Sequence, residues 1–146
     1  MSRAFWALGG RFETKAGVAE TGNGYSMFEA VMTKLAEPPL HVHHGEDEAW
    51  YVLSGKLTFH IGDHVHVAPP GTYVFAPRDV PHWFTVDEEP TRVLVFASPG
   101  GAFERIVGET GVPVESHPGP VPPDPATLAE PLRRNGVEIL APPPGH

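Results

Sequence analysis

The sequence predicts an all-β fold, a small antiparallel β-barrel with a short helical, proline-rich C-terminal extension. Glycine (16 residues) and proline (18 residues) are both in excess, and they divide the chain into short segments. Many of these segments alternate apolar and polar residues, which is the period of a strand with one buried face. The 146 residues, 40% of them hydrophobic, suffice for one globular domain with its own core.

The expected strands follow one another between residues 25 and 97. Residues 56–61 alternate most cleanly, with Leu57, Phe59 and Ile61 on one face, and Gly62-Asp63 forms a hairpin turn. The other expected strands span 25–35, 49–53, 64–67, 72–76, 82–86 and 92–97. Their spacing favours a barrel built from antiparallel neighbours.

Two helices are expected after the last of these strands. Residues 102–109 carry apolar side chains at helical spacing, and Gly111 ends that helix. Asp124-Pro125 predicts the start of a second helix, which Asn135-Gly136 ends and Pro131 kinks.

The C-terminal region is rich in proline. Ten of the 18 prolines lie at or after Pro113, so this region is not expected to join the centre of a sheet. We therefore expect a barrel domain over residues 1–112 and an extension over 113–146 that packs on it. An acidic linker is the alternative interpretation of the extension.

The charge and composition exclude several classes of partner. The formal net charge is −8 and the ten Lys and Arg residues are scattered, which argues against nucleic acid. The chain has no cysteine, so neither disulfides nor a thiolate metal site is available. With no signal peptide and no membrane span apparent, a cytoplasmic location is expected.

The stretch from Pro38 to Gly55 carries the chemistry. His41 and His43 lie two residues apart, so on an extended chain both imidazoles project from one face. Glu48 follows after a short turn and can reach the same point. Glu46 and Asp47 are the alternative candidates for the carboxylate ligand. A further imidazole is available at His82, which follows a proline-flanked turn. Imidazoles and a carboxylate are typical ligands of transition metals with open coordination positions.

These residues resemble the two motifs of the cupin family. The first motif, glycine-x5-HxH-x(3,4)-E-x6-glycine, fits His41, His43, Glu48 and Gly55, although Leu35 replaces its leading glycine. Among the acidic candidates, only Glu48 keeps the six-residue spacing to Gly55.

The second motif, glycine-x5-P-x-glycine-x2-H-x3-N, fits Gly71, Pro77 and His82. Asp79 replaces its middle glycine and Val86 its asparagine. Because aspartate tolerates a left-handed backbone better than most residues, the first change is mild.

The resemblance covers about residues 25–97 and implies a jelly-roll β-barrel with one divalent transition metal. The metal would be Fe, Mn, Ni, Co, Cu or Zn, held by His41, His43, Glu48 and His82. His64 and His66 share the spacing of the first pair but lack a following carboxylate, so we expect them to face outward, and His44 has the wrong parity for a ligand.

The position of the ligands along their strands predicts the lining of a substrate pocket. Trp50 follows Glu48 and Phe84 follows His82 at steps of two, which puts them on the ligand face. Neighbouring strands are expected to add Phe75, Phe96, Phe28 and Met32. The alternative is that these side chains only fill a small barrel.

Three functions are open at this stage. The first motif is similar to that of quercetinase-type (flavonol 2,4-dioxygenase) cupins, which implies a dioxygenase acting on a small aromatic or flavonol-like substrate with Glu48 as ligand and base. The alternatives are a non-oxidative isomerase, lyase or cyclase that uses the metal as a Lewis acid, and a small-molecule-binding cupin without turnover. A homodimer is expected, since cupins commonly pair through N-terminal strands.

Overall fold

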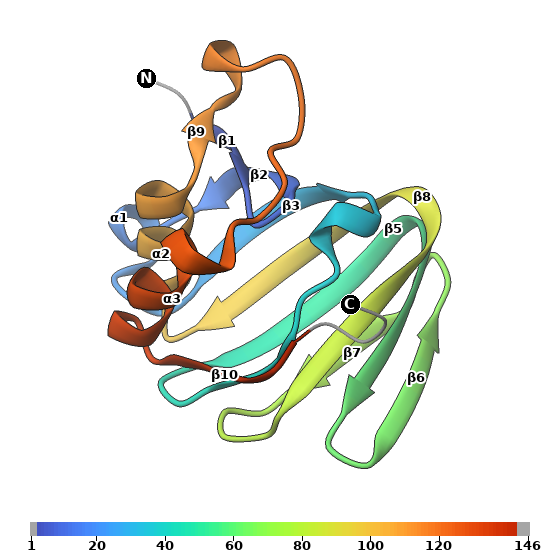
Figure 1. The fold of residues 1–146 in the computed structure, drawn as a ribbon. Coiled ribbons are helices and arrows are strands. Elements are labelled where there is room, and N and C mark those ends of the chain that lie inside the picture. The colour runs from blue at the N-terminus through green and yellow to red at the C-terminus, as the bar shows by residue number, and fades with distance from the viewer. Residues whose placement is uncertain (1–2, 143–146) are drawn as a thin grey trace.

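Two long, bent strands organise the protein in the computed structural model, which describes residues 3–142. β5 (Asp47–Ile61) and β8 (His82–Ser98) run antiparallel along their whole length, from the Asp47–Ser98 pair to the Ile61–His82 pair. Both bend in the middle, and each half therefore takes different neighbours (Figure 1).

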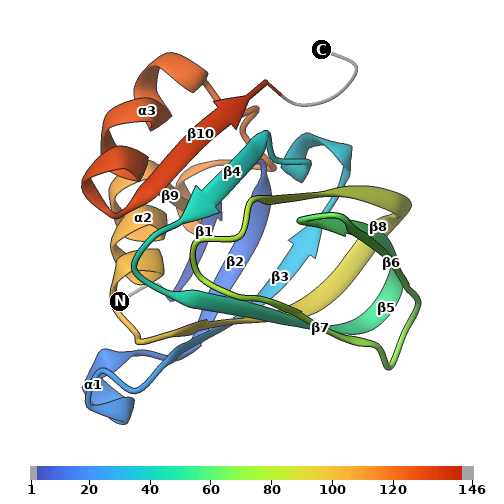
Figure 2. The ribbon, with the colours of Figure 1, turned by 90° about the horizontal axis from the view of Figure 1, so that it is seen from below.

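The remaining strands extend the sheet from these two. β6 (His64–Ala68) and β7 (Tyr73–Ala76) pair with the other edge of β5. β3 (Ser26–Met32) pairs with the second half of β8, whereas β4 (Leu40–His43) pairs with its start. β2 (Gly10–Ala16), β1 (Ala4–Ala7) and β9 (Val112–Pro113) continue from β3, and β10 (Val137–Ala141) pairs with β4. Every pairing is antiparallel, and the strands curve around a common interior (Figure 2).

That interior is filled by the inward-facing side chains of the strands. The fully buried apolar residues include Phe28, Ala30, Val52, Leu57, Phe59, Ala68, Val86 and Val93. Their burial is the main stabilising contribution, because apolar area removed from water is worth about 25 cal/mol per Å². The predicted all-β antiparallel barrel is confirmed.

The strand boundaries differ from the prediction at both bends. Residues 49–53 and 56–61 belong to one strand, β5, and residues 82–86 and 92–97 to another, β8. The predicted strand over 25–35 is shorter, since β3 ends at Met32 and a 3₁₀ turn, η1 (Lys34–Ala36), follows.

The helices lie at one end of the barrel. α2 (Ala102–Thr110) and α3 (Pro125–Arg134) confirm the two predicted helices, and α1 (Val18–Thr21) and the 3₁₀ turn η2 (Val114–Ser116) are short additions. The Asp124 side chain caps α3 by accepting a hydrogen bond from the Ala126 amide at 3.0 Å. Within residues 3–142, no helix combines the length and apolar character needed to cross a membrane.

The proline-rich region contributes only edge strands. β9 and β10 lie at the two ends of the strand order β10-β4-β8-β3-β2-β1-β9, as expected for a region that cannot occupy the centre of a sheet. Because β9 pairs with β1, the N-terminal strand has a neighbour on each side. The homodimer stays a prediction.

Gly55 is required at the bend of β5. Its φ of 86° is left-handed, and a Cβ atom built there would lie 2.7 Å from Thr91 Cα. Thr91 is itself fully buried, and its hydroxyl accepts from the Lys56 amide at 3.0 Å and donates to the Glu88 carbonyl at 2.7 Å. The two strands therefore approach too closely here for any side chain.

We expect Gly55→Ala to lower the free energy of unfolding by about 2–5 kcal/mol, from backbone strain plus overpacking. Gly71→Ala is the matched control, because Gly71 has a φ of 87° but no atom within 4 Å of an added Cβ. Only the strain of about 1–2 kcal/mol applies there. Urea unfolding of both variants measures the difference, and equal losses would contradict the close approach.

Candidate metal centre

Four predicted ligands come together inside the barrel. β4 carries His41 and His43, β8 begins at His82, and Glu48 lies at the start of β5. His41 and His82 are direct partners across the β4–β8 pair. Each of the four residues offers one ligand atom, and these atoms all lie within 4.8 Å of one another. That is the scale of one coordination sphere, since ligands lie about 2.0–2.2 Å from a zinc ion.

The cluster is removed from solvent. His41 is 9% exposed, His43 and Glu48 are each 5% exposed, and His82 is 1% exposed. The imidazole ring centroids are separated by 4.4 Å for His41–His82, 5.1 Å for His41–His43 and 5.3 Å for His43–His82. Four polar side chains share a buried space that an apolar core would otherwise fill.

The Nδ1 atom of each imidazole is held by an acceptor outside the cluster. His41 Nδ1 donates to the Pro39 carbonyl at 2.7 Å, and His82 Nδ1 donates to the Val80 carbonyl at 3.0 Å. His43 Nδ1 donates to Glu46 Oε1 at 3.0 Å. A neutral imidazole has one N–H, so each Nε2 is left with a lone pair for a metal.

These lone pairs face a carboxylate. Glu48 Oε1 lies 3.1 Å from His82 Nε2 and 3.3 Å from His43 Nε2. Two acceptors at this distance repel each other unless a cation lies between or beside them. Either a proton or a metal ion removes this repulsion between the two acceptors. Three nitrogens with one carboxylate oxygen are a donor set that transition metals prefer. The residues present therefore fit a divalent transition metal.

The pKa values follow from the same geometry. Burial, reinforced by the neighbouring imidazoles, lowers the pKa of His41 to about 3. Burial also disfavours the charged form of His43, but Glu48 and Glu46 outweigh it and raise its pKa. For Glu48, burial opposes ionisation while His43 and His82 outweigh it, so its pKa is lowered. At neutral pH the cluster holds a neutral His41 and an ionised Glu48.

We expect metal affinity to fall at low pH because of His43. Its raised pKa means that a proton occupies the metal-free ring below that pKa, and the metal must displace it. This proton alone weakens binding by about tenfold per pH unit below the pKa. Zn²⁺ titration calorimetry between pH 5.5 and 8, in buffers of different ionisation enthalpy, counts the released proton. An affinity independent of pH over this range would contradict the expectation.

The other histidines lie outside the cluster. His64 and His66 are exposed on β6, with ring centroids 6.2 Å apart, as predicted for outward-facing residues. His44 is half-exposed, and its Nδ1 and Nε2 lie 2.7 Å from Asp79 Oδ1 and 2.9 Å from Glu138 Oε1. His44 thus joins β4 to the loop before β8 and to β10.

Asp79 has the conformation predicted for it. Its φ is 68°, in the left-handed region where the second motif has glycine. The Asp79 amide donates to the His43 carbonyl at 2.8 Å, which connects the loop before His82 to the end of β4. The turn that positions one ligand is therefore bound to the strand that carries two others.

Trp50 and Phe84 lie on the inner face with the ligands. The Trp50 ring centroid is 5.6 Å from that of His82 and 6.5 Å from that of Phe84. Phe59, which was not predicted to line the site, packs against both, at 4.7 Å from Trp50 and 5.5 Å from Phe84. Its alternation with Leu57 and Ile61 had placed it on a buried face, but not beside a ligand.

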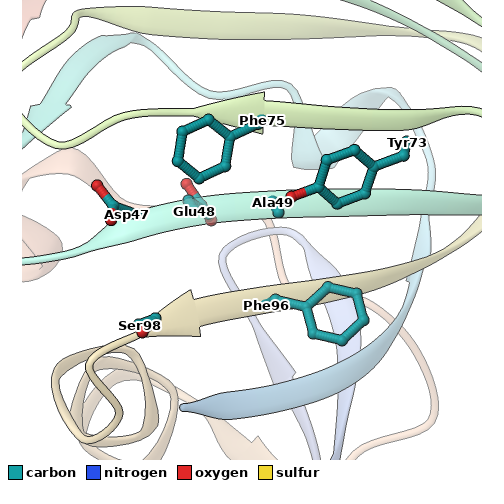
Figure 3. Close-up of a pocket in the computed structure, with 7 residues that line it drawn as sticks. All are labelled: Asp47, Glu48, Ala49, Tyr73, Phe75, Phe96 and Ser98. Carbon is teal, nitrogen blue, oxygen red and sulfur yellow. The ribbon is translucent and has the colours of Figure 1, made fainter. Parts of the chain in front are cut away.

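Phe75 and Phe96 do not face the metal cluster, contrary to the predicted lining. Their cross-strand partner is Ala49, one residue beyond Glu48, so they lie on the outer face of the sheet. Phe75 is 46% exposed. They border an open hollow of about 260 Å³ on that outer face (Figure 3), lined by Asp47, Glu48, Ala49, Tyr73, Phe75, Phe96 and Ser98.

Phe28 and Met32 are core residues of β3. The Phe28 ring packs 5.1 Å from Phe103 of α2 and 6.3 Å from Phe12 of β2. Met32 is 3% exposed in the same core. Their contacts support the packing alternative for these two residues.

Comparisons with known proteins agree with this architecture. Residues 28–97 match the Cupin_2 family model, described as a cupin domain. KdgF from a Halomonas species is similar in fold, with a TM-score of 0.57 and 19% identity over 64% of this chain and 81% of that chain. An RmlC-like cupin from Shewanella frigidimarina has a TM-score of 0.55 and 18% identity over 64% and 79%.

A third solved structure, a variant of Streptomyces PAC13 with uridine, has a TM-score of 0.55 and 13% identity over 67% of this chain and 75% of that chain. No curated protein is significantly similar in sequence. At these identities, the structural similarity establishes the fold.

Proposed function

Because residues 28–97 match a cupin domain and the chain has the cupin fold, we propose that this protein is a metal-dependent enzyme. Its metal ligands are His41, His43, Glu48 and His82. The observation that carries the proposal is the approach of Glu48 Oε1 to within 3.1 Å and 3.3 Å of two imidazole Nε2 atoms. A bound metal cation would satisfy the carboxylate and both imidazole lone pairs at once.

The reaction we propose is dioxygenation of a small aromatic or flavonol-like substrate. When bound, the metal would act as a Lewis acid toward a substrate oxygen and, if redox-active, would support reaction with O₂. Glu48 would accept the proton of a substrate hydroxyl, since its carboxylate is ionised at neutral pH. The similarity of the first motif to quercetinase-type cupins supports this choice.

The surroundings of the ligands suit an apolar substrate. Trp50, Phe59 and Phe84 form a connected group of rings beside His82. Such rings exclude water and offer flat apolar surface, while the low local dielectric strengthens the action of Glu48. We propose Trp50 and Phe84 as substrate-binding residues, with Phe59 supporting them.

A non-oxidative reaction is the second candidate. Proton transfer by Glu48 needs no oxygen, so the same residues would serve an isomerase, lyase or cyclase. Pac13, which has this fold at a TM-score of 0.55, is described as a nucleoside dehydratase. A binding protein without turnover is the third candidate.

Oxygen uptake by metal-loaded protein separates the candidates. The metal-free protein is loaded in turn with Fe, Mn, Co, Ni, Cu or Zn, assayed for bound metal, and mixed with flavonols or catechols in an oxygen electrode cell. We expect one metal per chain and oxygen uptake equal to substrate loss. Product formation without oxygen uptake favours the second candidate. A spectral shift on mixing without any product favours the third. If the loaded protein holds no metal, the proposal is overturned.

A further inference from the structure

His43 is held by carboxylates at both ring nitrogens. Glu48 Oε1 lies 3.3 Å from Nε2, on the side of the cluster, and Glu46 Oε1 lies 3.0 Å from Nδ1, on the far side. Glu46 directly precedes β5, and both Glu46 and Glu48 are buried, whereas the Asp47 carboxylate between them accepts from Arg78 on the outside.

The three imidazoles differ in what accepts their Nδ1–H. His41 and His82 donate to backbone carbonyls, at 2.7 Å and 3.0 Å, whereas His43 donates to a carboxylate. A charged acceptor makes a stronger hydrogen bond than a neutral one and increases the basicity of the opposite nitrogen. His43 is therefore the imidazole whose Nε2 is the strongest donor to a metal.

The burial of the Glu46 carboxylate is unfavourable for the free energy of folding. Its side chain is 2% exposed, and within residues 3–142 its Oε2 atom is buried without a hydrogen-bond partner. Leaving a buried polar atom unsatisfied costs about 1–3 kcal/mol, and more when it is charged. A backbone carbonyl would hold the ring without that cost, as it does for the other two imidazoles. The carboxylate is therefore unfavourable for packing and favourable for the electrostatics of His43.

We propose that Glu46 is the positioning residue of His43: it fixes the Nδ1–H tautomer and strengthens Nε2 as a metal ligand without itself touching the metal. The inference rests on the proposed metal site, but on neither the substrate nor the type of reaction. Glu46 would act through His43 and is not a catalytic residue.

Metal affinity of Glu46 variants tests the proposal. Glu46→Gln keeps an acceptor but removes the charge, and Glu46→Ala removes both. We expect Zn²⁺ affinity, measured by chelator competition, to fall by about 10–100-fold in Glu46→Ala, with Glu46→Gln between it and the wild type. The Co²⁺ absorption bands of Glu46→Gln should shift, since the ligand strength of His43 changes.

Glu138→Gln is the matched control. It removes a carboxylate from His44, next to His43 in sequence, but His44 is outside the cluster. Its Zn²⁺ affinity and Co²⁺ spectrum should equal those of the wild type.

A measurement on the wild type keeps the test independent of how the variants fold. Long-range ¹H–¹⁵N spectra of the Zn²⁺-bound protein should show His43 protonated at Nδ1 and coordinated through Nε2. The reverse arrangement would overturn the inference, and so would wild-type affinity in both Glu46 variants. Absence of Zn²⁺ binding by the wild type would instead overturn the proposed function and this inference together.

Discussion

Replacing His82 by alanine is expected to weaken metal binding by on the order of 100-fold or more, since changes that only reorient a ligand already cost about 10–100-fold. His82 is 1% exposed, is the direct partner of His41 across β4 and β8, and lies 3.1 Å from Glu48. Its loss removes one of three nitrogens and one of the two imidazoles that lie against the Glu48 carboxylate. Metal content after loading and dialysis, measured by elemental analysis, checks the result.

The chain supplies its own control for this experiment. His64 and His66 repeat the spacing of His41 and His43, but they are exposed on β6. His64→Ala should keep the wild-type metal content, and circular dichroism should show that both variants are folded. If His64→Ala loses as much metal as His82→Ala, the assignment of the ligands is wrong.

Local geometry predicts only part of the four-residue cluster, because the choice of Glu48 and of the distant His82 depended on the resemblance to the cupin motifs. His41 and His43 lie on the same face of a strand because they are two residues apart. The turn before Glu48 is short, so Glu48 stays close to these two histidines. Asp79 could also be predicted, since the left-handed backbone that the motif requires is one that aspartate tolerates. For these residues, the number of intervening residues and the local backbone conformation determine where they lie in the structure.

The lining could not be predicted in the same way. Whether Phe75 and Phe96 face inward depends on how β7 and β8 are aligned with β5, and this register is a tertiary property. Both residues pair with Ala49 and not with Glu48, so both face outward. A shift of one residue in either pairing would have reversed the result.

The predicted boundaries of the two long strands were wrong for a related reason. Ser54-Gly55 has the composition of a turn, yet it forms the bend of one continuous strand. Gly55 is needed there because Thr91 of β8 lies against it, and nothing near Gly55 in the sequence indicates that contact. A glycine required by a distant neighbour looks the same as a glycine required by a turn.

The position of Glu46 in the sequence indicates a second role besides that of a metal ligand. Glu46 was considered as a rival ligand to Glu48, and its spacing to Gly55 argued against that role. Glu46 lies immediately before β5, and a carboxylate three residues after a ligand can reach the back of the ligand's ring. A carboxylate close to a ligand can therefore also act as the hydrogen-bond acceptor of that ligand's ring.

Substitution of Glu48 by glutamine should separate proton transfer from metal binding. Glutamine keeps the shape and one oxygen ligand, so most of the metal should remain bound to the three imidazoles. It cannot accept a substrate proton, and general-base catalysis contributes about 10²–10⁴-fold, so kcat should fall by about that factor. The lowered pKa of Glu48 means that the wild-type base is ionised at neutral pH, which makes the comparison clean there.

Asp47→Asn is the matched control for Glu48→Gln. Asp47 precedes Glu48 directly but points outward, where its carboxylate accepts from the Arg78 amide at 2.8 Å. Loss of this charge should leave metal content and kcat close to the wild type, because strand parity separates the two carboxylates on opposite faces of β5. Undiminished turnover by Glu48→Gln at full metal loading would exclude Glu48 as the base. The proton would then have to leave the substrate by another route, with Glu48 reduced to a metal ligand.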